Sequence, residues 1–242
     1  MIDGTGQVSV SVDALEREFD IIAHNMANVS TAGFKRRCSS FTQALEAQTG
    51  GGTGAPAVEL SPGGFDFSQG ALVQTDRTLD VALSGQGFFV VESPEGPLYT
   101  RHGVFQTSRN GQIVDTAGRL VAGTGGPVLV PPEVDASQIY IDNAGRVSVG
   151  STSLGQLRVV QFADKEAQLV PTGLNCFRAP ADLQPTNAAN VVVRQGYEEA
   201  SNVRLVEELV NMITVSRLYE ANMKWVSVNR DNSNTALSVA MG

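Results

Sequence analysis

The chain has 242 residues, of which 42% are hydrophobic and 17% are charged, so it can build one or two compact cores. Its formal net charge of -8 argues against a nucleic-acid-binding protein, because those proteins need a basic surface. No apolar run approaches the roughly 20 residues of a membrane span, and no cleaved secretion signal is recognisable at the N-terminus, so we expect neither membrane insertion nor classical export.

The first predicted element is a helix over residues 8–29. Its hydrophobic residues are separated by alternating steps of four and three, which gives an unbroken heptad pattern of Val8, Val12, Leu15, Phe19, Ile22, Met26 and Val29. Ser11 or Asp13 can cap the start of this helix, and Gly33 can end it. An apolar stripe of this kind needs a partner, so we expect a second helix to pack against it.

The polar face of this helix carries Asn25, Asn28 and Thr31 at a spacing of three residues. A solvated surface is the simplest interpretation. Asparagine nevertheless lowers helix propensity, so its repeated use favours hydrogen bonds to neighbouring subunits. The basic run 35–37 that follows is either solvated or in contact with acidic neighbours.

Helical periodicity ends soon after this point. The short segment 41–47 can still be helical, but the glycine-rich stretch 49–54 and the nearby Pro56 and Pro62 predict a flexible connector. The pattern changes again at about Gly70, which marks the start of a different kind of domain.

From Gly70 onward the pattern is that of short strands separated by tight turns. β-branched and aromatic residues fill the runs 79–83, 87–92, 98–101, 104–107, 112–115, 119–122, 127–130, 139–141, 146–149, 157–163 and 191–194. Turn signals lie at 93–96 and 110–111, where proline fixes φ or glycine accepts a positive φ. So many short strands without long helices between them predict a mostly antiparallel sheet or a barrel-like domain.

Two similar stretches, DTAGRLVAG at 115–123 and DNAGRVSVG at 142–150, form a local repeat. Each is typical of a turn that ends in glycine and leads into a strand. A calcium-binding loop is the alternative, but neither copy has enough acidic oxygen atoms for one.

The last predicted element is a long helix within residues 201–228. One face of it carries Leu209, Met212, Ser216, Tyr219, Met223 and Val226, and Val206, Val210 and Ile213 widen that face. We expect this face to be the partner of the first helix, with Leu15, Phe19, Ile22 and Met26 packed against Leu209, Met212, Tyr219 and Met223.

These elements predict an α+β protein in which the N- and C-terminal helices pair as a coiled-coil-like unit around a central, mostly antiparallel β-domain. The expected divisions are residues 1–45 together with 198–242 as a helical inner domain, 46–69 as the connector, and 70–197 as the β-domain. The two ends of the chain therefore come together, and the middle is looped out.

Residues that could carry out chemistry are scarce. The stretch 85–87 (GQG) lacks the third glycine of a phosphate-binding loop. The two histidines, His24 and His102, are too few for a zinc cluster or a His-based catalytic centre. Cys38 and Cys176 do not make a disulfide framework, and two unpaired thiols are the favoured interpretation. We expect no catalytic residues, no cofactor and no metal site.

Three blocks of the sequence resemble, in the same order, the bacterial flagellar rod and hook proteins. Residues 21–36 (IIAHNMANVSTAGFKR) are similar to the N-terminal motif ANNIANxxTxGFK of that family. Residues 69–121 are similar to its central block, in which TxxxLDxAxxGxGFF precedes YTRxGxF. Residues 198–224 (EEASNVRLVEELVNMITVSRLYEANMK) are similar to its C-terminal motif, built on ESNV and RxYE.

The resemblance implies a structural subunit, not an enzyme, that assembles helically into the axial drive shaft of the flagellar basal body. Its implied partners are copies of itself, other axial proteins of the rod and hook, the flagellar export apparatus and the surrounding ring proteins. It implies a place in the rod, within the periplasm, reached without a cleaved signal peptide. The compact middle of the chain favours the proximal-rod FlgF type, and the distal-rod FlgG type comes next.

We expect the contacts of such a subunit to use the helical seams and a few polar residues beside them. The expected packing residues are Leu15, Phe19, Ile22, Asn25, Met26, Asn28, Val29, Phe34, Asn202, Val206, Leu209, Met212, Ile213, Tyr219 and Met223. Asn211 is a further polar position of the same kind.

Two other classes of protein remain as alternatives. A secreted enzyme acting on cell-wall glycans could use Asp76 and Asp80 as a pair of carboxylates, although turn and strand-edge roles suit them better. A helical-stalk adhesin should instead form a closed trimer, which a short seam split between the two ends of the chain does not favour.

Overall fold

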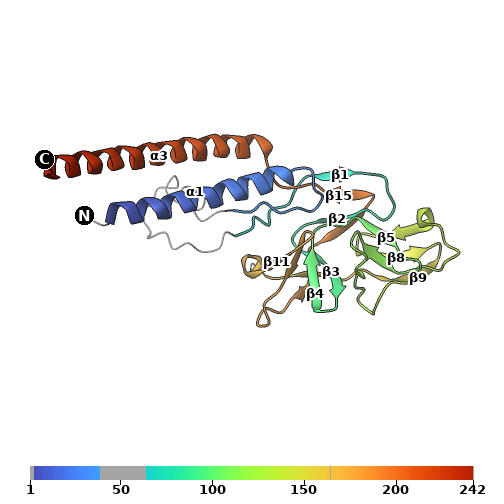
Figure 1. Ribbon diagram of the computed structural model, residues 1–242. Helices are drawn as coiled ribbons and strands as arrows, with labels where there is room; N and C mark the ends of the chain where they lie inside the picture. The colour runs from blue at the N-terminus through green and yellow to red at the C-terminus, as the bar shows by residue number, and fades with distance from the viewer. Residues whose placement is uncertain (1–2, 39–63, 164, 242) are drawn as a thin grey trace. The chain divides into compact units, whose positions relative to one another are not determined.

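The computed structural model describes residues 3–38, 64–163 and 165–241 (Figure 1). The chain divides into two compact units. Unit 1 comprises residues 1–27, 37–64 and 204–242, and unit 2 comprises 28–36 and 65–203. The expected short helix at 41–47 and the connector at 49–54 lie outside the described residues.

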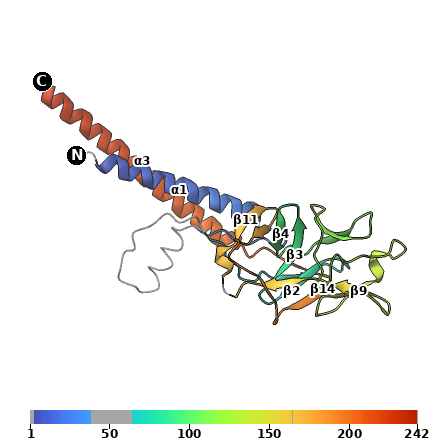
Figure 2. The ribbon, with the colours of Figure 1, turned by 90° about the horizontal axis from the view of Figure 1, so that it is seen from below.

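Unit 1 is built on two helices, α1 (Asp3–Ala27) and α3 (Leu205–Met241), which lie side by side (Figures 1 and 2). Leu15 and Ile22 of α1 are buried together with Val215 of α3. Four partly buried side chains surround this cluster: Phe19, Met26, Met212 and Tyr219. The rings of Phe19 and Tyr219 meet edge to face, with centroids 6.4 Å apart.

The details of both helices differ from the prediction. Helix α1 begins at Asp3, so neither Ser11 nor Asp13 caps it. In α3 the residues turned toward α1 follow a seam of Glu208, Met212, Val215 and Tyr219, whereas Leu209 and Met223 are exposed. Apolar residues lie around much of α3, so its sequence offers more than one heptad seam. The observed seam keeps the expected Met212 and Tyr219 but has Glu208 and Val215 where Leu209 and Met223 were expected.

Unit 2 is a β-domain whose strand pairs are all antiparallel. Its largest sheet has the order β11 (Val170–Gly173), β12 (Cys176–Arg178), β4 (Gly96–Thr100), β3 (Phe88–Ser93), β10 (Val159–Gln161) and β13 (Thr186–Asn187). A three-stranded sheet contains β7 (Ile139–Ile141), β8 (Arg146–Val149) and β9 (Thr152–Gln156). The remaining pairs are β1 (Leu72–Gln74) with β15 (Tyr197–Glu199), β2 (Val81–Ser84) with β14 (Val192–Gln195), and β5 (Phe105–Thr107) with β6 (Ile113–Asp115). Short 3₁₀ turns lie at η1 (Ala136–Gln138) and η2 (Glu166–Gln168).

Strand β3 lies between two hydrophobic clusters. Phe89 and Val91 belong to an aliphatic cluster shared with the three-stranded sheet, while Phe88 and Val90 belong to an aromatic one. Side chains alternate between the faces of a strand, so both faces of the large sheet are covered. The continuous apolar run FFVV at 88–91 reflects this double burial.

The expected α+β class and the mostly antiparallel β-domain are confirmed, but some strands are not. The runs 119–122 and 127–130 form only isolated bridges, such as Val121 with Val91 and Leu129 with Gln112. Several strands were not predicted, among them β9, β11, β12 and β15. The residues of β11 are all exposed and include Pro171, so no alternation marks it as a strand.

The local repeat forms two turns of the same geometry. In each, the aspartate side chain (Asp115 or Asp142) accepts hydrogen bonds from the backbone N–H groups two and four residues further on, at 2.8–2.9 Å. The glycines have positive φ angles, 80° at Gly118 and 78° at Gly145. The prediction of turns at both copies is confirmed.

Candidate functional site

The most concentrated polar feature of unit 2 is a buried cluster around Glu199, the last residue of β15. One carboxylate oxygen, Oε1, accepts hydrogen bonds from Nζ of Lys35 at 2.6 Å and from the backbone N–H of Gly70 at 3.0 Å. The other, Oε2, accepts from Nη1 of Arg101 at 3.2 Å. The backbone carbonyl of Glu199 accepts from the N–H of Gly33 at 2.6 Å. We call Lys35, Arg101 and Glu199 the Glu199 cluster.

Both cations of the cluster are tied to backbone as well as to Glu199. Lys35 donates to the carbonyl of Ser68 at 2.7 Å, and Arg101 donates through Nη2 to the carbonyl of Gly85 at 2.8 Å. Lys35 and Arg101 are 2% and 3% exposed. Burial lowers the pKa of each, and the charge of Glu199 opposes that shift. Both cations therefore depend on one carboxylate.

A second anchor lies three residues after Glu199. The side chain of Asn202 accepts a hydrogen bond from the backbone N–H of Arg36 at 2.7 Å and donates to the carbonyl of Asp66 at 2.8 Å. The N–H of Asp66 in turn donates to the carbonyl of Arg36 at 2.9 Å. Gly33 has a φ of +66°, and a Cβ there would lie 2.4 Å from the backbone nitrogen of His102. Only glycine fits this close approach.

These contacts attach residues 28–36 to the β-domain, although the chain on either side of them belongs to unit 1. The attachment brings together three distant parts of the sequence: 33–36, 101 and 199–202. The polar atoms of the Glu199 cluster are engaged with one another and with backbone groups, except Nε of Arg101, which is buried without a hydrogen-bond partner. This arrangement suits holding a segment in place rather than transforming a substrate.

Unit 1 contains a smaller polar site at Asn25, which is fully buried. Its carboxamide donates to the carbonyl of Arg37 at 2.9 Å and accepts from the N–H of the same residue at 2.9 Å. It also donates to Glu208 of α3 at 3.3 Å. The pKa of the neighbouring His24 is lowered by burial and by the positive charge of Arg37. Asn25 thus bonds within its own chain, to the segment after α1 and to α3.

The predicted packing residues fall into three groups in the structure. Leu15, Ile22, Asn25 and Phe34 are buried within the chain. Phe19, Met26, Asn28, Val29, Asn202, Met212 and Tyr219 are half-buried. Val206, Leu209, Ile213 and Met223 are exposed. Sequence reasoning missed Arg101 and Glu199 altogether and treated Lys35 only as part of a basic run. The sequence did contain a signal for Lys35, the basic run 35–37. A contact with acidic neighbours was one of the two interpretations of that run, and solvation was the other.

The carboxylates considered for catalysis have structural roles. Asp80 is 2% exposed and accepts hydrogen bonds from the hydroxyl of Thr75 and from Nε of Arg77, both at 2.6 Å. Asp76 is exposed, has a φ of 58° and accepts from Gln74. Each therefore shapes the turn before β2 instead of facing a substrate.

Other candidate chemistry is equally sparse in the part of the chain that the structure describes. The described residues hold no group of three or more His, Cys, Asp or Glu side chains placed to bind a metal ion. Cys38 and Cys176 form no disulfide in the part of the chain that the structure describes, and burial raises the pKa of Cys176. Among the described helices, none is long and apolar enough to cross a membrane.

Comparison with known proteins assigns both parts of the chain to one group. Residues 82–149 match the family "Flagellar hook protein FlgE/F/G D1 domain", and residues 194–239 match "Flagellar basal body rod FlgEFG protein C-terminal". The FlgG rod proteins of Buchnera aphidicola subsp. Schizaphis graminum and Agrobacterium fabrum are each 34% identical, over 90% of this chain and 92% of their own. The FlgF rod protein of Caulobacter vibrioides is 32% identical, over 92% of this chain and 91% of its own.

The lengths of these alignments separate the two kinds of relative. The Buchnera FlgG alignment has 245 positions but covers 90% of the 242 residues here, about 218, so about 27 positions have no counterpart in this chain. The Agrobacterium FlgG alignment has 248 positions at the same coverage, so about 30 of its positions have no counterpart in this chain. The Caulobacter FlgF alignment has 227 positions and covers 92% of this chain, about 223 residues. Only about 4 of its positions therefore have no counterpart here. This chain therefore has the compact length of the FlgF relative.

The matched regions include Arg101, Glu199 and Asn202, so the buried anchors of unit 2 lie within the shared sequence. Identities above 30% over nine-tenths of the chain extend the relationship to both units. The chain belongs to the family of flagellar basal-body rod proteins, and it is a structural protein of the rod rather than an enzyme.

Proposed function

We propose that this chain is a rod subunit of the FlgF type, which stands in the proximal rod and assembles helically with its own copies. The compact length supports the FlgF type, because the FlgG relatives carry about 27–30 positions that are absent here. Its partners are the neighbouring axial proteins of the rod and hook. The flagellar export apparatus delivers it to the periplasm, and ring proteins surround it.

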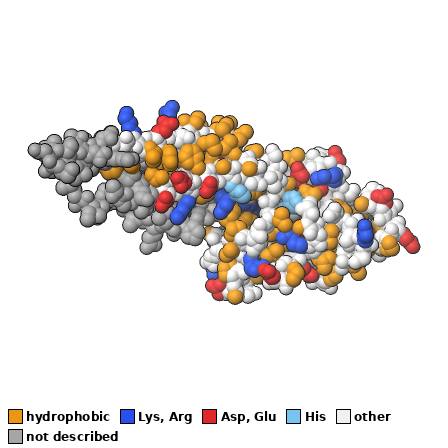
Figure 3. Space-filling model, in the orientation of Figure 1, with side chains coloured by type: hydrophobic (Ala, Val, Ile, Leu, Met, Phe, Trp, Pro, Cys, Tyr) orange, Lys and Arg blue, Asp and Glu red, His pale blue; other side chains and the backbone are white. Residues whose placement is uncertain are grey.

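The observation that carries the assembly part of this proposal is an apolar face of α3. Val206, Leu209, Val210 and Ile213 are 73%, 42%, 57% and 54% exposed. Successive helical residues are about 100° apart, so these four side chains lie on the side of α3 opposite Val215, which contacts α1. Hydrophobic side chains gather on this part of the surface (Figure 3). A contiguous exposed apolar face on a soluble chain favours a protein partner.

In this proposal the two faces of α3 have different partners. One face pairs with α1 as a coiled-coil-like unit, through Leu15, Phe19, Ile22, Met26, Met212 and Tyr219. The other face, with Val206, Leu209, Ile213 and Met223, packs on helices of neighbouring subunits. Asn28, Val29 and Phe34 come after α1 in the chain. Asn25 and Asn202 stabilise the subunit itself through hydrogen bonds within the chain. A heterologous contact repeated at a fixed rotation gives an open helix, as a growing tube requires.

An aspartate at Ile213 tests the assembly face. Burying a large apolar side chain contributes about 1.5–3 kcal/mol, and a buried unpaired charge costs more, so Ile213→Asp should prevent rod assembly. The purified chain should remain folded, because Ile213 is already exposed. Thr214→Asp is the matched control, since Thr214 is exposed but lies off this face. Normal rods containing Ile213→Asp, counted in isolated basal bodies by electron microscopy, would contradict the proposal.

A further inference from the structure

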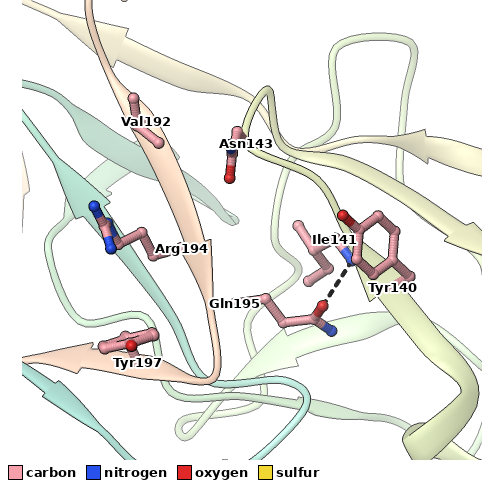
Figure 4. A pocket seen from close by; sticks show the side chains of 7 residues that line it. All are labelled: Tyr140, Ile141, Asn143, Val192, Arg194, Gln195 and Tyr197. Atoms are coloured by element: carbon pink, nitrogen blue, oxygen red, sulfur yellow. Dashed lines mark hydrogen bonds between the residues drawn. The ribbon is translucent and has the colours of Figure 1, made fainter.

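A pocket in unit 2 lies between β7 with the turn after it and the strands β14 and β15. It has a volume of about 360 Å³ and is lined by Tyr140, Ile141, Asn143, Val192, Arg194, Gln195 and Tyr197 (Figure 4). Its lining shares no residue with the Glu199 cluster.

The floor of the pocket is fixed by hydrogen bonds. Gln195 donates through Nε2 to the carbonyls of Ile139 at 2.8 Å and Thr78 at 3.0 Å, and its Oε1 accepts from the N–H of Ile141 at 3.1 Å (Figure 4). The backbone of Val193 donates to the carbonyl of Asn143 at 3.0 Å. The strands that form the pocket are thereby held together without a ligand, which is the preorganisation that binding favours.

The rim carries an exposed cation among aromatic and aliphatic side chains. Arg194 is exposed and forms no ion pair with any residue that the structure describes. Its guanidinium carbon lies 6.0 Å from the ring centroid of Tyr197, whose hydroxyl is hydrogen-bonded to Gln74 at 3.3 Å. Tyr140 is 61% exposed and Val192 is 41% exposed. Tyrosine and arginine on a rigid surface are the residue types that most often dominate protein interfaces.

This chemistry favours a carboxylate next to an aliphatic side chain. The guanidinium can bind a carboxylate with two parallel hydrogen bonds, and Tyr140 with Val192 can cover an aliphatic group. The amide of Gln195 donates both of its N–H groups to backbone carbonyls, so the charged group that the lining offers to a ligand is the guanidinium of Arg194. The lining residues include no acidic side chain that would repel an anion.

We propose that this pocket receives an acidic segment of a second copy of the chain, as a contact between unit 2 of one subunit and unit 2 of its neighbour. The inference rests on the proposed assembly into a rod, which supplies many copies at fixed positions. Unit 2 holds 14 Asp and Glu against 11 Lys and Arg. Its exposed Glu133, Asp135 and Asp182 form no ion pair with any described residue, so a second copy offers carboxylates to the unpaired arginine. The apolar face of α3 and this pocket are then two independent contacts of one subunit.

A photo-crosslinking amino acid at position 140 tests this directly in the bacterium that makes the protein. Basal bodies are isolated from cells that express an equal mixture of isotopically light and heavy chain, and crosslinked peptides are identified by mass spectrometry. The expected product joins position 140 of one copy to an Asp- or Glu-containing peptide of unit 2 of another. Adding Arg194→Glu should reduce this product at least tenfold, because it places like charges in contact. Arg146→Glu, an exposed arginine on β8 outside the pocket lining, should leave the product unchanged.

The outcomes separate this inference from the proposed function. Absence of the chain from purified rods would overturn the proposed function itself. If the chain is present in rods but position 140 links only to a ring protein, to a glycan fragment or to nothing, the pocket does not bind a second copy. Crosslinking to a basic segment of a second copy would overturn the assigned chemistry. An equal loss of product with Arg146→Glu would show that the charge of the surface matters and the pocket does not.

Discussion

Replacement of Glu199 by glutamine tests whether the buried cluster holds unit 2 together. The substitution keeps the size of the side chain but removes the negative charge that Lys35 and Arg101 share. Breaking a buried ion pair by removing one partner costs about 3–5 kcal/mol, because the other charge is left buried without compensation. A whole domain is stable by only about 5–15 kcal/mol. We therefore expect Glu199→Gln to lose a large part of the free energy of unfolding of unit 2.

The cost should also depend on pH in a defined direction. Burial already lowers the pKa of Lys35, and loss of Glu199 removes the charge that opposes this shift. In the variant the unfolded chain then binds more protons than the folded chain at pH values between the lowered pKa and the ordinary lysine value of about 10.4. Stability of Glu199→Gln should consequently rise with pH across that window, as Lys35 loses its proton in the folded state.

Two measurements on the full chain follow the two units separately. Hydrogen exchange of the amides of β3 and β4, measured by mass spectrometry, reports on unit 2, and the fluorescence of Trp225 in α3 reports on unit 1. Glu198→Gln is the matched control on the same strand, since Glu198 lies 3.7 Å from the exposed side chain of Arg77. An exposed pair of this kind contributes about 0–1 kcal/mol. If Glu199→Gln costs no more than Glu198→Gln, the reasoning about the cluster is wrong.

Three further substitutions probe other contacts. Gly33→Ala should lower the melting temperature measured by calorimetry, because the new Cβ would lie 2.4 Å from a backbone nitrogen at a φ of +66°; an unchanged value would contradict the close approach. Asn25→Ala leaves the backbone groups of Arg37 without their partner and should cost about 1–3 kcal/mol in urea unfolding followed by helical circular dichroism, whereas a cost near zero would mean water replaces the amide. Burial lowers the pKa of His102 more than the nearby Asp80, Asp115 and Glu198 raise it, so the folded state binds fewer protons and stability should fall as pH drops below about 6.5. His102→Gln should flatten that pH dependence of the stability of unit 2 below about pH 6.5, and a variant as pH-sensitive as the parent chain would refute the assignment of the dependence to His102.

The sequence was most informative where burial is on both faces or where one residue type fixes a turn. The run that became β3 was predicted because residues 88–91 (FFVV) are all apolar, and both faces of its sheet are covered. The paired Asp-x-Ala-Gly-Arg turns were predicted because glycine with positive φ and an aspartate acceptor suffice to form them. In β11, by contrast, pairing with β12 decides the structure, and its exposed residues carry no pattern of their own.

The choice of seam on α3 illustrates a different limit. Its sequence places apolar residues on more than one face, and periodicity alone ranks Leu209 as highly as Val215. The structure turns Val215 and Glu208 toward α1, where Glu208 meets Asn25. A buried polar pair restricts the alignment of two helices more strongly than a methyl group does, because an unsatisfied buried group costs about 1–3 kcal/mol. A glutamate in the seam is therefore the feature that a purely hydrophobic pattern overlooks.

The Glu199 cluster gives a physical reason why three separate sequence blocks occur together. The first block supplies Gly33 and Lys35, the central block supplies Arg101, and the last block supplies Glu199. No block can satisfy its own buried charges, because the pairs join residues 98 and 164 positions apart. Unit 2 consequently reaches its full stability only when both the first and the last block have been supplied, since β15 pairs with β1 in a two-stranded sheet and Glu199 of β15 also holds Lys35. A chain that ends before Glu199 should leave Lys35 and Arg101 unneutralised and should remain largely unfolded in unit 2.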